Sequence, residues 1–197
     1  MSAVSWIVLA VVLLLVFWAV GAFNRLTRLK NAIANAFGQI DVQLKRRYDL
    51  IPNLVEVARK YLAHEAQTLE AVIAARNQAR SAEQSAAASP LNAGAIGALA
   101  GAEQVLGGAL GRLFAVAEAY PDLKADQTMR ELSEELSSTE NRIGFARQAY
   151  NDHVLEFNDA AAQFPALIVA RLFNFQPQSM LQSTQNEAER AAVKVSF

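Results

Sequence analysis

The run QIDVQLKRRYDLIPN, residues 39–53, is the part of the chain with the most side chains able to take part in chemistry or binding. Asp41 precedes Lys45 by four residues, the spacing of an ion pair on a helix surface. One interpretation is a solvated face whose charges neutralise one another. The other is a face that docks a partner or a second copy of the chain, because arginine and tyrosine are enriched at binding hot spots. The anchors of such a contact would be Arg46, Arg47 and Tyr48.

The sequence contains none of the common catalytic or metal-binding patterns. Its two histidines, His64 and His153, are isolated, so no histidine pair at helical spacing is available to a metal. The absence of cysteine excludes thiolate nucleophiles and cysteine-type zinc sites, and no phosphate-binding glycine loop is present. We therefore expect no enzyme activity, no metal and no cofactor. A site could be assembled only if the fold brought together Tyr48, Asp49, His64, Glu65, Glu140 and Tyr150.

Composition favours an all-α protein that does not bind nucleic acid. The 18 Lys and Arg residues against 19 Asp and Glu residues leave a net charge of -1, which gives no basic excess to hold a phosphate backbone. Apolar residues make up 53% of the chain, alanine is the commonest of them, and there are only five prolines. This mixture suits helices better than strands.

An uncharged apolar segment at the N-terminus predicts a single transmembrane helix. The segment begins at Val4 and ends at Phe23, and at ~1.5 Å per residue its length matches the ~30 Å hydrocarbon layer of a bilayer. A cleaved secretory signal is the alternative, but no basic leader precedes the segment. Arg25, Arg28 and Lys30 follow it directly, so the positive-inside rule predicts an exterior N-terminus and a cytoplasmic body.

Two long apolar stripes must position the polar residues of the body. The first advances in steps of three and four residues, which indicates one face of an amphipathic helix. Pro52 interrupts it, and we expect a kink there rather than a new helix capped by Asp49. The first stripe consists of Ile33, Phe37, Ile40, Leu44, Tyr48, Ile51, Val55, Ala58 and Leu62. The second, which we expect to face it, consists of Met129, Leu132, Leu136, Ile143, Tyr150, Val154, Phe157, Ala161 and Phe164.

The segment between the stripes predicts a bend followed by a closely packed helix. Residues 81–92 lose periodicity and contain Pro90, so we expect the first hairpin bend there. Glycines then recur four residues apart, a spacing that allows two helices to approach closely. They are Gly97, Gly101, Gly107 and Gly111. Residues 84–102 are also uncharged, so a second membrane span is an alternative.

The organisation that follows is an N-terminal tail and transmembrane anchor over residues 1–24, an antiparallel bundle of long helices over 25–175, and a polar, mobile C-terminal tail over 176–197. Asp126 is expected to cap the last long helix, and Pro165 to end it before a short apolar piece. On that helix, Glu140, Arg142 and Arg147 are expected to pair between helices.

Four segments of the chain resemble the LemA family of bacterial membrane proteins. They are QIDVQLKRRYDLIPNLVE, His64-Glu65 followed by Leu69, YPDLKA, and TENRIGFARQAYNDHVLEFN. The resemblance implies a membrane span with a short exterior tail, a bundle of long helices at the bacterial cytoplasmic (inner) membrane, and neither enzyme activity nor a cofactor. The matching residues, which are candidates for folding or contact, are Asp41, Arg47, Tyr48, Asp49, Pro52, Asn53, His64, Glu65, Tyr120, Pro121, Asp122, Glu140, Arg142, Tyr150 and Asn151.

Two functional hypotheses arise from these features. The first is a membrane-anchored scaffold that forms homo-oligomers or docks membrane or cytoplasmic partners, and whose assembly could shape the membrane. Anchoring supports it because confinement to a membrane raises the effective concentration of the copies. The second is an adaptor or activator of a membrane-bound protease.

Overall fold

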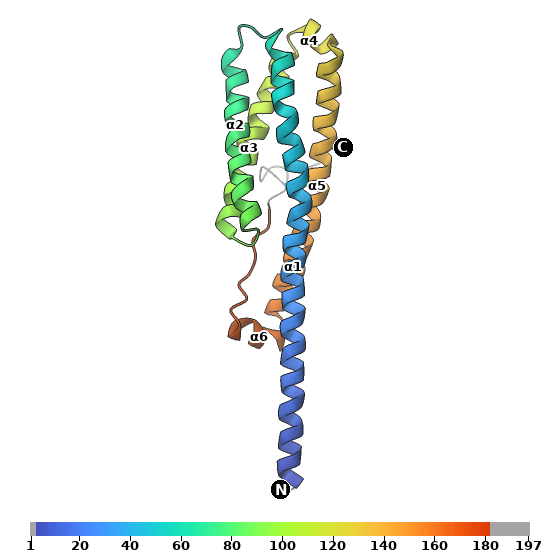
Figure 1. The fold of residues 1–197 in the computed structure, drawn as a ribbon, viewed down its shortest axis with the longest axis vertical. Coiled ribbons are helices and arrows are strands. Elements are labelled where there is room, and N and C mark those ends of the chain that lie inside the picture. The colour runs from blue at the N-terminus through green and yellow to red at the C-terminus, as the bar shows by residue number, and fades with distance from the viewer. Residues whose placement is uncertain (1–2, 182–197) are drawn as a thin grey trace, which may run out of the picture.

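The computed structural model describes residues 3–181, and that part of the chain is helical with no strand. The all-α prediction is thereby confirmed. The helices, shown in Figure 1, are α1 (Ala3–Arg59), α2 (Ala66–Ala88), α3 (Ala93–Ala117), α4 (Pro121–Ala125), α5 (Gln127–Ala162) and α6 (Ala166–Leu172).

Helix α1 joins the apolar N-terminal segment to the bundle without a break. Its first part projects beyond the other helices (Figure 1). Large apolar side chains there are exposed, including Leu14 at 68% and Phe17 at 75%. This part is long and apolar enough to cross a membrane. From Leu26 onward, α1 buries one face in the bundle. The predicted arrangement of an apolar N-terminal helix followed by a helical bundle is therefore confirmed.

The two apolar stripes form the core, as predicted. All nine residues of the first stripe are buried, and α1 packs along α5, which carries the second stripe. The aromatic rings of Phe37 and Tyr150, one from each stripe, lie 6.2 Å apart. Phe164 is the exception: it lies beyond the end of α5 and is 81% exposed, because the chain turns at Pro165 before it can pack.

Proline 52 lies inside α1, and α2 compensates for its missing backbone donor. The helix continues to Arg59, so the alternative in which Asp49 caps a new helix is wrong. A proline has no N–H for the carbonyl four residues earlier, which here belongs to Tyr48. The Arg76 side chain of α2 donates a hydrogen bond from Nε to that carbonyl oxygen over 2.9 Å. The carbonyl oxygen that Pro52 leaves without a donor in α1 therefore accepts a hydrogen bond from a guanidinium group of α2.

This arrangement predicts that Arg76 contributes more to stability when residue 52 is a proline. Arg76→Met should lower the free energy of unfolding by about 1–3 kcal/mol, because a largely buried carbonyl loses its partner. In a Pro52→Ala background, the new N–H can satisfy Tyr48, and the same substitution should cost clearly less. Urea denaturation followed by circular dichroism in detergent measures both differences. Equal losses in the two backgrounds would disprove the compensation.

The connections differ from the predicted ones. The first reversal of the chain occurs at residues 60–65. Leu62 is buried in this turn and continues the apolar spacing, so the sequence pattern does not show that α1 has already ended. Residues 81–88 are helical, and only residues 89–92 form the expected connection, which is the second one.

Both α3 and α5 begin at a side-chain cap. The side chain of Asn92 accepts a hydrogen bond from the backbone N–H of Ala95. The predicted cap of α5 is confirmed: Asp126 accepts from Met129 N–H over 2.9 Å.

The glycines of α3 do not bring helices together within this chain. Gly97, Gly101 and Gly111 are exposed, and a Cβ added at any of them would meet no atom within 4 Å. The prediction of glycine-mediated close packing is wrong for these three positions. A second span over residues 84–102 is also wrong, because the turn at 89–92 divides that stretch. Helix α3 itself passes a length and composition test for a span, but it packs within the bundle against α2.

Candidate functional site

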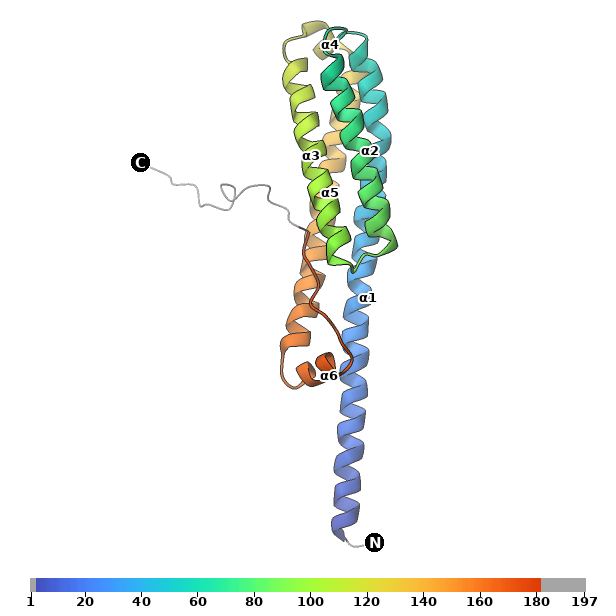
Figure 2. The same cartoon turned by 90° about the vertical axis from the view of Figure 1, so that its left-hand side faces the viewer.

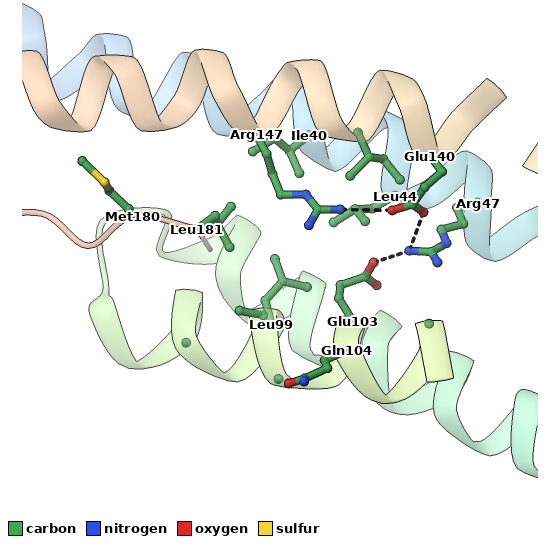
Figure 3. Close-up of a pocket in the computed structure, with 15 residues that line it drawn as sticks. Ile40, Leu44, Arg47, Leu99, Glu103, Gln104, Glu140, Arg147, Met180 and Leu181 are labelled. Atoms are coloured by element: carbon green, nitrogen blue, oxygen red, sulfur yellow. Dashed lines mark hydrogen bonds and ion pairs between the residues drawn. The ribbon is translucent and has the colours of Figure 1, made fainter. Parts of the chain in front are cut away.

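One side of the bundle is open. Helix α1 packs on α5 and on α2, and α2 packs on α3, whereas α3 and α5 have few close contacts. A cavity of about 330 Å³ lies between them (Figure 3). We call it the α3–α5 groove. Its apolar lining comes from Ile40, Leu44, Leu99, Ile143 and Leu181, and its polar lining includes Arg47, Glu103, Gln104, Glu140 and Arg147.

A chain of ion pairs crosses the groove and links three helices. Arg47 of α1 places Nη1 at 2.6 Å from Oε2 of Glu103 on α3 and at 3.1 Å from Oε2 of Glu140 on α5. Arg147 lies 3.2 Å from the other oxygen of Glu140 (Figure 3). The side chains of Arg47 and Glu103 are only 8% and 11% exposed. The charges of this pair are therefore balanced by groups of the protein and are only slightly solvated.

Tyr48 belongs to the same network. Its hydroxyl donates a 2.6 Å hydrogen bond to Oε1 of Glu103. Burial, together with the charge of Glu103, raises the pKa of Tyr48 far above its ordinary value, so the hydroxyl remains a donor at any physiological pH. Tyr48 is 1% exposed and Arg47 is 7% exposed. In this conformation neither side chain is available to a partner on the surface.

The first residues of the predicted C-terminal tail are bound along α5. The Asn158 side chain donates to the carbonyl of Gln178 over 3.0 Å and accepts from its N–H over 2.8 Å. Asn151 makes the same pair of bonds with Leu181, over 2.7 and 2.9 Å. Tyr150 donates to the carbonyl of Ser179, and burial raises the pKa of Tyr150 to about 12. We call residues 176–181 the strap; the rest of the predicted tail, 182–197, lies outside the described residues.

The strap closes one end of the groove. Leu181 is 3% exposed and lines the groove together with Met180. The hydrogen bonds from Asn151 and Asn158 go only to backbone atoms of the strap, so they do not depend on which side chains the strap carries. Side chains of α5 therefore hold the strap in place through its backbone.

The remaining predicted residues lie apart from one another. Asp41 and Lys45 form the expected pair at 2.6 Å, and Arg46 pairs with Glu135 of α5. His64 and Glu65 lie in the connection after α1, while Tyr120 and Asp122 lie at the start of α4. Asp49, Asn53 and Arg142 are exposed. The constellation of Tyr48, Asp49, His64, Glu65, Glu140 and Tyr150 is thus not assembled into one site, and residues 3–181 contain no group of three acidic or histidine residues placed for a metal.

A carboxylate pair between α1 and α2 escaped the sequence analysis. Glu83 of α2 is 1% exposed and interacts with Asp41 and Lys45 of α1. Burial, and then the hydrogen bond with Asp41, raise the pKa of Glu83 to about 7. Burial opposes ionisation of Asp41 too, but its hydrogen bonds with Glu83 and Lys45 outweigh that effect and lower its pKa. The two carboxyls are therefore arranged to share a proton near neutral pH.

Glu83 and Glu103 were missed for the same reason. Each has no acidic neighbour within ten residues in its helix, and the partner that explains it is on α1. An isolated acidic residue in an alanine-rich helix was the available signal. Asn158 carried no comparable signal, since its partner is backbone.

The chain is similar to three magnetosome proteins. It is 28% identical over 150 residues to magnetosome protein MamQ of Magnetospirillum gryphiswaldense, an alignment that covers 68% of this chain and 55% of the relative. It is also 28% identical over 157 residues to magnetosome proteins MamQ 2 and MamQ 1 of Paramagnetospirillum magneticum, covering 72% of this chain and 58% of each relative. The chain thus spans just over half the length of these relatives. The model of the LemA family matches residues 36–197, a range that contains the groove and the strap. The chain therefore belongs to the LemA family.

Proposed function

We propose that the protein is a non-enzymatic scaffold, held at a membrane by α1, that docks an extended segment of a polypeptide partner in the α3–α5 groove. One observation carries the proposal: the open groove continues directly from the surface on which Asn151 and Asn158 already bind extended backbone. A partner segment would lie in line with the strap.

The lining of the groove defines the segment that fits. Leu44, Leu99 and Ile143 line an apolar floor, but each is only 1% exposed, so a docked segment would touch them only at the base of the groove. The charged groups at its wall are already paired with one another, so they favour an uncharged or mixed segment rather than a strongly acidic or basic one. Gln104 adds an amide able to bond to backbone.

A second copy of the chain is the partner that we expect first. Copies anchored in one membrane are confined to its plane. Their effective concentration toward one another is therefore higher than that of a partner free in solution. A different membrane protein benefits from the same confinement. Both are polypeptides, and differently tagged copies distinguish them.

Site-specific photo-crosslinking in native membranes tests the proposal. A benzophenone amino acid at Gln104, in the groove, is expected to crosslink to a second polypeptide, whereas one at Gln78, exposed on α2, is not. If two differently tagged copies are co-expressed and the crosslinked product carries both tags, then the partner is a second copy.

A pair of glycine substitutions provides the control. Gly101→Leu places a side chain in the groove, and Gly38→Leu places one on exposed α1 outside it; both positions have open space for a Cβ. Each change should also stabilise its helix by up to about 1 kcal/mol. The Gln104 crosslink should disappear in Gly101→Leu and persist in Gly38→Leu. A crosslink unaffected by Gly101→Leu, or no crosslink from Gln104 at all, would refute docking in the groove.

A further inference from the structure

Helix α6 lies where α1 leaves its apolar segment. The ring of Phe173, just after α6, is 4.8 Å from the ring of Phe23, and that of Phe175 is 5.6 Å from it. Phe23 is the last residue of the apolar stretch that begins at Val4. Both views place α6 against α1 at the end of the bundle nearest the projecting segment (Figure 1, Figure 2).

The residues around α6 expose an unusual concentration of large apolar side chains. Val169 and Ala170 are buried against the bundle, as expected for a packed helix. The opposite side presents Ile168 and Leu172, four residues apart on one face, at 56% and 76% exposure. Phe164 and Phe173 flank them. Of the nine large apolar residues that are exposed between residues 24 and 181, four lie in segment 164–173.

Three exposed basic residues lie on α6 or just after the apolar segment of α1. Arg25 and Arg28 follow the end of the apolar segment on α1, and Arg171 lies on α6 itself; all three are exposed. Arginine at such a level can reach phosphate groups of lipids while its aliphatic part stays near the acyl chains. Apolar side chains next to basic ones are the features of an element that lies in a membrane interface.

We propose that segment 164–173 is a second membrane contact, in which Phe164, Ile168, Leu172 and Phe173 enter the lipid interface of the leaflet from which α1 emerges. We assign lipid as the occupant of this apolar face because the face is continuous, through Phe23 and Phe173, with the exposed apolar surface of α1, which is long and apolar enough to cross a membrane. The proposal depends on α1 crossing the bilayer, but not on docking in the α3–α5 groove.

This contact would fix the orientation of the bundle. A single helix crossing a membrane leaves the attached body free to tilt and rotate about its exit point. With α6 seated beside α1, two points of contact define which side of the bundle faces the membrane. The α3–α5 groove would then be held at a constant height and direction relative to the bilayer.

Depth-dependent fluorescence quenching in vesicles tests the contact on the full chain. Because the sequence has no cysteine, single cysteines can be introduced and labelled with the environment-sensitive dye NBD. Phe164→Cys is compared with Phe145→Cys, since both phenylalanines are exposed, at 81% and 74%. Ile143 and Arg147 line the groove together with Ile40, so residue 145 lies near the level of Ile40. That level is about 25 Å along α1 from Phe23 at ~1.5 Å per residue. Leu14→Cys reports on the anchor.

The label at 164 is expected to shift its emission to the blue when the protein moves from detergent to phosphatidylcholine vesicles. It should also lose emission to a quencher attached near the lipid glycerol, while the label at 145 is quenched only by aqueous iodide. Adding phosphatidylglycerol should strengthen the lipid quenching at 164 through the basic residues.

Two results would overturn the contact. Labels at 164 and 145 that respond identically to iodide and to lipid quenchers, with Leu14→Cys quenched by lipid, would disprove it while leaving the anchor intact. Absence of lipid quenching at position 14 as well would remove the membrane span on which it depends.

Discussion

Replacing Arg47 by methionine is expected to lower the free energy of unfolding by about 3–5 kcal/mol, the cost of leaving a buried charge without its partner. Arg47 neutralises Glu103, whose side chain is 11% exposed, and also bonds Glu140. Methionine fills similar space but offers no donor. Glu103 would keep only the hydroxyl of Tyr48. Since the three partners belong to α1, α3 and α5, the loss should also widen the groove.

Arg46→Met is the matched control. Arg46 is the adjacent residue and also forms an interhelical pair, with Glu135, but its side chain is 50% exposed. Exposed pairs contribute at most about 1 kcal/mol, so this variant should unfold close to wild type. The double variant Arg47→Met with Glu103→Gln should recover part of the loss, because it removes the unpaired charge. Urea denaturation of the detergent-solubilised proteins measures the free energy of unfolding of the wild type and of the three variants. Equal losses for Arg46→Met and Arg47→Met would contradict the buried network.

The second large effect concerns pH and Glu83. Its pKa is raised from 4.5 to about 7 in the folded protein, so the folded state binds a proton that the unfolded chain has already released. Its contribution to stability is therefore fully present below pH 4.5 and is lost as the pH rises through about 7. The loss amounts to at most about 3 kcal/mol. Asp41, whose pKa is lowered, acts in the opposite sense and only at lower pH.

Glu83→Gln should remove this dependence. An amide can remain hydrogen-bonded to Asp41 without titrating, so the variant should keep its stability between about pH 5 and about pH 8, a range that brackets the Glu83 pKa of about 7. Glu70→Gln, an exposed position on the same helix, should retain the wild-type slope. Thermal unfolding across this pH range provides the measurement. A wild-type slope in Glu83→Gln would show that another group is responsible.

Local patterns were sufficient for the helices and for the faces that they bury. The spacing of Ile33, Phe37 and Ile40, and of Val154 and Phe157, indicated the core, because side chains three and four residues apart share one side of a helix. The cap at Asp126 depends on a neighbour three residues away and could be predicted for the same reason. The apolar helix that begins near Val4 can be predicted from the composition and length of the segment alone. In each case the relevant partner lies within one or two turns.

The groove and its network required the tertiary structure. In sequence, Arg47 and Tyr48 read as a surface pair beside Arg46, since nothing nearby shows that Glu103, more than fifty residues away, lies opposite them. The same holds for Arg76, whose function depends on a carbonyl freed by Pro52, and for the strap, which is held through backbone atoms common to every residue. The role of a charged or amide side chain depends on the groups that tertiary packing places beside it. The apolar N-terminal segment, the helices and their apolar faces follow from the sequence alone. Only the three-dimensional arrangement decided which polar residues pair in the interior and which side of the bundle remains open.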